Sequence, residues 1–189
     1  MHIRDEEFIR NKVPMTKAEI RMISIGKLDL KKDSILIDVG AGTGSVGIEA
    51  STYLSKGKVY AIEKKDIGVE LINKNLKKLK VNNLEVIHGN APIDLKIKTF
   101  NRMFVGGSSS NMQGIIDYFL NYCDSLGIIV INIIALETLT EVLKILKANK
   151  DKLKDIEIVN VNISKNKNIG NYTMMTGENP IYIISAKKI

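Results

Sequence analysis

The chain has 189 residues, of which 44% are hydrophobic and 26% are charged. These are the proportions of an ordinary globular protein, and they exclude a disordered chain, a collagen-like fibre and a coiled coil. No apolar run approaches the roughly 18 residues that a membrane span requires. A single cysteine excludes a disulfide framework, and two histidines argue against a structural zinc site, so no metal is predicted.

The net charge of +7 comes from 28 lysines and arginines against 21 aspartates and glutamates. Such an excess indicates either an anionic partner or a compositional bias toward lysine. Arginines are few and aromatic residues make up only 5% of the chain, whereas nucleic-acid sites use arginine forks and stacking aromatics. We therefore predict no nucleic-acid or membrane partner, and leave open a small polyanionic substrate. The charged N-terminus predicts no secretory signal.

The first predicted elements form a cap. Residues 5–11 are predicted as a short helix, and Thr16 with Glu19 matches a capping box before a second helix, with Gly26 as its stop. Residues 1–26 are thus expected to be an N-terminal helical cap segment on a single domain that spans 1–189. Beyond the cap, strands are predicted at 34–39, 58–62, 84–88, 102–105, 127–133, 156–164 and 180–186, and helices at 45–54, 66–79, 111–124 and 136–148.

Alternating strands and helices with near-continuous apolar strands predict an α/β fold, a doubly wound Rossmann-like sheet with helices on both faces. The last two strands have no helix between them, because the link 165–179 is polar. They should pair antiparallel, which gives a mostly parallel sheet with one antiparallel strand near the C-terminus.

A glycine turn follows the first core strand at Gly40–Gly44. Ligands of doubly wound sheets bind at such strand ends. Gly42-x-Gly44-x-x-Gly47 followed by Glu63 matches the dinucleotide fingerprint, but there the first glycine should follow the strand directly. The better frame is Gly40-x-Gly42-x-Gly44 preceded by Asp38, a pattern that resembles the S-adenosylmethionine-dependent methyltransferases.

Each residue type in this pattern suits that cofactor. Glu63 accepts hydrogen bonds only and could bind both ribose hydroxyls. Asp38 would order the turn or accept from the ammonium of the methionine end. The superfamily often has aspartate where this chain has Asn90, so the main chain of Ala91 is favoured for the adenine. The methionine end would lie against bare amides and carbonyls of Gly40, Ala41, Gly42, Thr43 and Gly44.

Further segments resemble one family along nearly the whole chain, the decarboxylating cobalt-precorrin C15-methyltransferases of corrin biosynthesis. They include PMTK at 14–17, IDVGAGTGSVGIEA at 37–50, FVGGS at 104–108 and GNYTM at 170–174. The resemblance implies methyl transfer from S-adenosylmethionine to C15 of a cobalt-precorrin of the 6B type, with loss of the ring C acetate carboxyl as CO₂. It also implies a homotetramer that works in the cytoplasm, and it places Thr16 among the cofactor contacts.

Such a substrate is a polycarboxylate tetrapyrrole, so cations are candidate clamps, although each could equally be a solvated surface charge. The glycines before Ser108 would leave room for a flat macrocycle. Polar side chains at strand and hairpin ends could bind its edges. The candidate substrate residues are Lys17, Arg21, Arg102, Lys165, Gly106, Gly107, Ser108, Asn132 and Tyr172.

Three alternatives remain. The first is an RNA or DNA methyltransferase on this fold, which would usually carry an Asn/Asp-Pro-Pro-aromatic motif after the fourth strand. This chain has the sequence VGGS there, at 105–108. The similar sequence NPIY at 179–182 lies at the start of the last strand instead. The second alternative is a module that binds a nicotinamide dinucleotide. The third is a non-enzymatic protein that retains the cofactor-binding fold.

Overall fold

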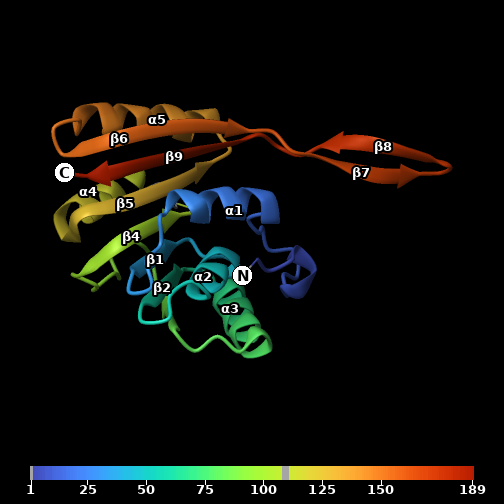
Figure 1. The fold of residues 1–189 in the computed structure, drawn as a ribbon, viewed down its shortest axis with the longest axis horizontal. Helices are drawn as coiled ribbons and strands as arrows, with labels where there is room; N and C mark the ends of the chain where they lie inside the picture. Colours follow the sequence, from blue (N-terminus) through green and yellow to red (C-terminus); the bar gives the residue numbers. More distant parts are fainter. Residues whose placement is uncertain (1, 108–110) are drawn as a thin grey trace.

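The computed structural model describes residues 2–107 and 111–189. Seven of its strands form one sheet in the order β3-β2-β1-β4-β5-β9-β6 (Figure 1). The strands of this sheet are β1 Ile35–Val39, β2 Lys58–Glu63, β3 Leu84–His88, β4 Phe100–Val105, β5 Cys123–Ile133, β6 Leu153–Val161 and β9 Ile181–Lys188.

The pairing confirms the predicted fold class. β1 lies parallel to β2 and β4, β2 to β3, and β4 to β5. β9 runs antiparallel between β5 and β6. The first residues of β9 therefore lie at the same sheet edge as the carboxyl ends of the parallel strands.

Helices cover both faces of the sheet, as an all-buried parallel sheet requires. They are α1 Ala18–Lys27, α2 Ser45–Ser51, α3 Asp66–Leu79, α4 Met112–Tyr122 and α5 Leu136–Ala148, preceded by the short 3₁₀ helix η1 Asp5–Glu7. Alternation along β4 separates two apolar layers: Met103 packs in the layer with α4 and α5, and Phe104 in the layer with α1, α2 and α3.

The polar link 165–179 is not an irregular connection. It forms a second, two-stranded sheet of β7 Ser164–Ile169 and β8 Tyr172–Gly177. This hairpin projects well beyond the main sheet (Figure 1), and Tyr172 at its tip is 76% exposed. The sequence prediction missed it because its residues do not alternate between apolar and polar.

The predicted capping box is wrong. Lys17, not Thr16, is the N-cap of α1 and makes no side-chain capping bond. The Glu19 carboxylate lies 2.9 Å from Nζ of Lys165 on β7 instead. α1 also continues past Gly26 to Lys27.

Two other boundaries differ. Only Asp5–Glu7 is helical within the predicted helix 5–11. α4 ends at Tyr122 and β5 begins at Cys123, earlier than the predicted strand start, because Cys123 pairs with Phe100 of β4 across a register shift.

Within the described residues, no helix is both long and apolar enough to cross a membrane. The same residues hold no group of three or more His, Cys, Asp or Glu side chains arranged to bind a metal ion.

Candidate active site

A cavity of about 880 Å³ lies at the carboxyl ends of the parallel strands. This volume is in the upper part of the ~300–1,000 Å³ range of small-molecule sites. The turns after five strands line it, and the segment before α1 closes one side. The lining stretches are 13–17, 38–42, 62–65, 89–91, 104–107, 132–135 and 177–179.

The turn after β1 requires glycine at its first position. Gly40 has φ +70°, and a Cβ there would lie 2.5 Å from the carbonyl oxygen of Gly107 in the turn after β4. The two turns thus pack backbone against backbone. Gly106 and Gly107, both in the cavity wall, donate to the carbonyl of Val39 at 2.9 and 3.4 Å.

The amides of this turn are not bare, contrary to the sequence prediction. Those of Gly40 and Ala41 donate to the Ile62 carbonyl at 3.0 and 3.2 Å, and that of Gly44 donates to Ala41 at 2.8 Å. The Gly42 amide donates to Oε2 of Glu63 at 2.9 Å. A ligand can still lie close to the turn, because there are no side chains at its glycines.

Thr43 and Gly44 shape the turn rather than line the cavity. Thr43 is buried, and its carbonyl accepts from Nδ2 of Asn75 at 2.9 Å. Gly44 is the N-cap of α2 in the left-handed conformation.

Asp38 is 1% exposed and lies under the turn, in the cavity wall. Its Oδ2 accepts from the main-chain amide of Gly47 in the first turn of α2 at 2.8 Å. Its Oδ1 has no hydrogen-bond partner among the described residues. Desolvation by burial, with a smaller contribution from the nearby Glu63, raises the pKa of Asp38 to about 7 against the opposing effect of the hydrogen bond from Gly47. A buried carboxylate oxygen without a partner is costly, and a ligand cation would relieve that cost.

Glu63 ends β2 and is also largely buried. Besides its bond from Gly42, its Oε1 accepts from the Lys65 amide at 2.9 Å. Each carboxylate oxygen has a second lone pair, so both oxygens remain available to a ligand hydroxyl.

The turn after β3 contributes Asn90 and Ala91, both in the wall. The Asn90 amide donates to Oδ2 of Asp94 at 2.7 Å, while Ala91 is buried. Asn132 of β5 also lines the cavity, and its side-chain Nδ2 donates to Oγ of Ser24 on α1 at 3.0 Å.

The segment of residues 2–17, called the strap below, closes the cavity beside the glycine turn. Thr16 and Lys17, the candidate cofactor and substrate residues of this segment, both line the cavity. The strap passes so close to the turn that a Cβ on Gly42 would lie 3.2 Å from the Pro14 carbonyl oxygen.

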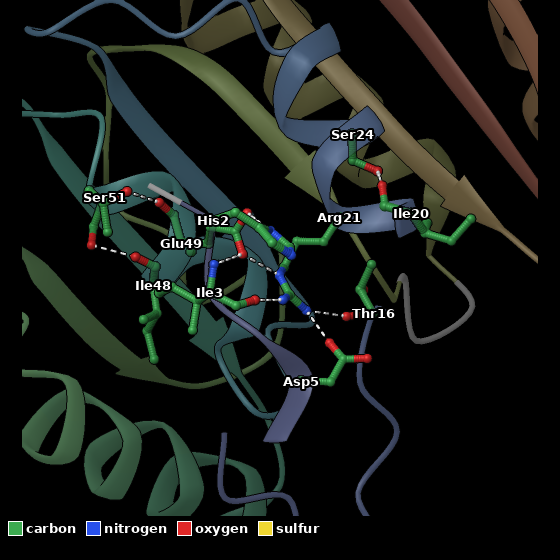
Figure 2. Close-up of polar contacts among 12 residues, drawn as sticks. His2, Ile3, Asp5, Thr16, Ile20, Arg21, Ser24, Ile48, Glu49 and Ser51 are labelled. Atoms are coloured by element: carbon green, nitrogen blue, oxygen red, sulfur yellow. Dashed lines mark hydrogen bonds and ion pairs between the residues drawn. The ribbon is translucent and has the colours of Figure 1, made fainter. Parts of the chain in front are cut away.

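Arg21 is not a substrate clamp: it is 0% exposed and outside the cavity wall. Figure 2 shows its guanidinium at the centre of the contacts that hold the strap. Nε donates to Oε2 of Glu49 at 2.7 Å, and Nη1 donates to Oδ1 of Asp5 at 3.0 Å and to the Thr16 carbonyl at 2.7 Å. The Ile3 carbonyl accepts from Nη2. Every arm of the side chain is thus used within the protein.

Arg102 is likewise structural. It lies near the start of β4, away from the carboxyl ends, and donates to the carbonyls of Leu28, Asp29 and Asn101. Burial is the main cause that lowers the pKa of Arg102. Tyr172 does not line this chain's cavity, and Lys165 pairs with Glu19 outside the wall. Ser108 lies outside the described residues.

Several wall residues escaped the sequence prediction. One group continues the turns after the parallel strands, and extending each predicted strand end by two residues would have found it. The other group lies at the start of β9, which reaches the same edge of the sheet because β9 is antiparallel. The two groups together comprise Lys64, Lys65, Ile134, Ala135, Asn179 and Ile181.

Comparison with known proteins gives a consistent result. Residues 7–188 match the family model described as a precorrin methyltransferase domain. A protein of Pyrobaculum aerophilum named "Probable cobalt-precorrin-6B C(15)-methyltransferase (decarboxylating)" is 39% identical over 188 residues, which cover 97% of this chain and 94% of that protein.

Two solved structures superpose over nearly their full length. The precorrin-6y C5,15-methyltransferase of Geobacter metallireducens has a TM-score of 0.90 at 36% identity and covers 98% of this chain and 97% of its own. The precorrin 8W decarboxylase of Methanobacterium thermoautotrophicum has a TM-score of 0.89 at 30% identity, with 97% and 98% covered.

Proposed function

The chain belongs to the precorrin methyltransferase family, and we propose that it methylates C15 of a cobalt-precorrin of the 6B type with loss of the ring C acetate carboxyl as CO₂. The observation that carries the proposal is a single cavity that both the cofactor and the substrate would occupy. One end holds the glycine turn with Asp38 and Glu63, and the other end opens toward the turns after β4 and β5.

The residues at the first end fit S-adenosylmethionine, which supplies an activated methyl group when bound. The unpartnered Oδ1 of Asp38 suits its ammonium, because this buried acceptor has no other donor among the described residues. Glu63 would accept from the ribose hydroxyls, and Asn90 and Ala91 would border the adenine. A dinucleotide fits less well, since amides that could bind a pyrophosphate already donate within the chain.

The second end suits a large, flat ring. Ile133, Ile134 and Ile181 present apolar surface there, and Gly106 and Gly107 add no side chains to the wall. Lys17 contributes a positive charge beside α1 for a substrate carboxylate. These residues would orient the ring and exclude water, which supplies much of the rate of a reaction that needs no protein nucleophile.

The second part of the reaction is a bond cleavage within the substrate. The bond between the acetate carboxyl carbon and its methylene breaks, and its electron pair passes into the conjugated macrocycle. A proton then replaces CO₂ on that side chain. The protein's task is to hold the carboxylate in a fixed orientation in a site of low water content.

Mass spectrometry of the product tests this function. Incubation with S-adenosylmethionine and cobalt-precorrin-6B should give a product that gains CH₂ and loses CO₂. Methylation of RNA or DNA in place of the precorrin would overturn the proposal. Omitting S-adenosylmethionine is the control and should abolish the gain of CH₂.

We further propose that residues 1–189 act as one domain in a cytoplasmic homotetramer, without nucleic-acid or membrane partners. The projecting hairpin supports self-association, because it exposes the apolar side chains of Ile169, Tyr172, Met174 and Met175. Exposed apolar patches of this kind commonly mark protein interfaces.

A further inference from the structure

Asn75 of α3 makes an unusually complete set of bonds. Its side chain is 0% exposed. Nδ2 donates to the Ile9 carbonyl and to the Thr43 carbonyl, both at 2.9 Å, and Oδ1 accepts from the Ile9 amide at 2.7 Å. One carboxamide therefore satisfies three main-chain groups on two different segments.

Those two segments both form the cofactor end of the cavity. Thr43 lies in the glycine turn directly after Gly42, a wall residue, and Ile9 lies in the strap before the wall residues Val13 and Pro14. Asn75 itself is not in the wall. It thus ties the turn and the strap together from behind.

The chemistry of the side chain explains why asparagine stands here. Asparagine is a poor residue for the interior of a helix, because its amide competes for main-chain groups. Here two donors and one acceptor meet two carbonyls and one amide. Alanine or leucine would leave these buried groups unpaired, and a carboxylate would face two carbonyls.

We propose that Asn75 is a positioning residue for the cofactor site. By bonding both segments it fixes the spacing between the strap and the glycine turn, so that the cavity is formed before the cofactor binds. Preorganisation of this kind raises affinity, because less ordering is needed on binding. The inference rests on the proposed function only in taking S-adenosylmethionine as the ligand.

Asn83 offers a matched control. Its Nδ2 also donates to two carbonyls, those of Ser51 and Leu54, at 3.0 and 2.9 Å. Ser51 is the last residue of α2 and Leu54 follows it by three residues, and both lie outside the main cavity wall. The Asn83→Ala variant therefore loses similar bonds at a distance from the site.

Calorimetric titration with S-adenosylhomocysteine, well below both melting temperatures, tests the proposal. Asn75→Ala should weaken binding by about tenfold, whereas Asn83→Ala should leave it within about twofold. Equal affinity of Asn75→Ala and the wild type would overturn the positioning role. Failure of the wild type to bind would instead count against the proposed function.

Hydrogen exchange on the wild type keeps the test open if Asn75→Ala does not fold. Binding of S-adenosylhomocysteine should slow exchange of the Ile9 amide, the donor to Asn75, although Ile9 is outside the cavity wall. An unchanged exchange rate at Ile9, with slowed exchange in the glycine turn, would mean that the strap and the turn are not coupled.

Discussion

Glu63 accepts a hydrogen bond from the main-chain amide of Gly42 at 2.9 Å. The acid that ends β2 therefore holds the turn that follows β1. Its other oxygen is held by the Lys65 amide. The carboxylate proposed to bind the ribose is thus fixed in place before any ligand arrives, which is the condition for a strong charge-assisted bond.

Replacing Glu63 by alanine should weaken S-adenosylhomocysteine binding by about 1–3 kcal/mol, because a charge-assisted acceptor is lost and the Gly42 amide is left unpaired. Calorimetric titration measures this. Glu85→Ala is the control: Glu85 is an exposed acid on β3 that pairs with Lys58 at the surface. An unchanged affinity for Glu63→Ala would mean that the ribose is bound elsewhere.

Local patterns predicted the sheet and the cofactor turn well, since both depend on short-range signals. Apolar runs mark the buried strands. Gly40 is required because its turn packs against the turn after the neighbouring strand β4. Asp38 and Glu63 could be placed because strand ends meet at one edge of a parallel sheet.

Long-range pairs could not be predicted in this way. Glu19 has the spacing of a capping residue, yet its partner Lys165 is on the hairpin. Arg21 was a candidate to bind a substrate carboxylate because it is an arginine, but it pairs with Glu49 on the fully buried helix α2. A charge within the apolar stretch of α2 was the one available signal that a buried cation must face it.

The affinity for S-adenosylhomocysteine should rise with pH up to about 7 and then level off. Burial, with a smaller contribution from Glu63, raises the pKa of Asp38 to about 7. The ligand ammonium pairs best with the ionised carboxylate, so below that pH binding must first remove a proton. The affinity should fall by at most about tenfold per pH unit.

Titrations at pH 6 and 8 in buffers of different ionisation enthalpy would detect the released proton. Asp38→Asn keeps an acceptor for the Gly47 amide but has no charge, so it should bind weakly and show a flat pH profile over this range. A wild-type profile that is also flat would exclude Asp38 as the ammonium partner.

Arg21→Met should destabilise the fold by about 3–5 kcal/mol, because it leaves the carboxylate of Glu49 buried without its cation. The same change removes the hydrogen bonds by which Arg21 holds the strap at Ile3, Asp5 and Thr16 (Figure 2). Urea unfolding measures the loss. Lys58→Met breaks an exposed pair with Glu85 and should cost at most about 1 kcal/mol. Similar losses for the two variants would refute the structural role of Arg21.

Replacing Tyr172 and Met175 together by serine should shift the protein toward smaller oligomers, since both are exposed on the projecting hairpin. Sedimentation velocity at several concentrations measures the species present. The hairpin projects beyond the main sheet (Figure 1), and both side chains are largely exposed, so the melting temperature of the isolated subunit should change little. A tetramer that survives both substitutions would place the interface on another surface.

Lys17→Met should raise the KM for the cobalt-precorrin by about three- to tenfold and leave the affinity for S-adenosylhomocysteine unchanged. Lys17 lines the cavity beside α1, and the two arginines first considered as clamps are both committed to main-chain carbonyls. Lys12 provides the control, because it is an exposed lysine of the same strap outside the wall. Lys12→Met should therefore behave as the wild type. If both variants raise the KM equally, the substrate responds to the overall charge of the strap, and Lys17 does not bind a particular carboxylate.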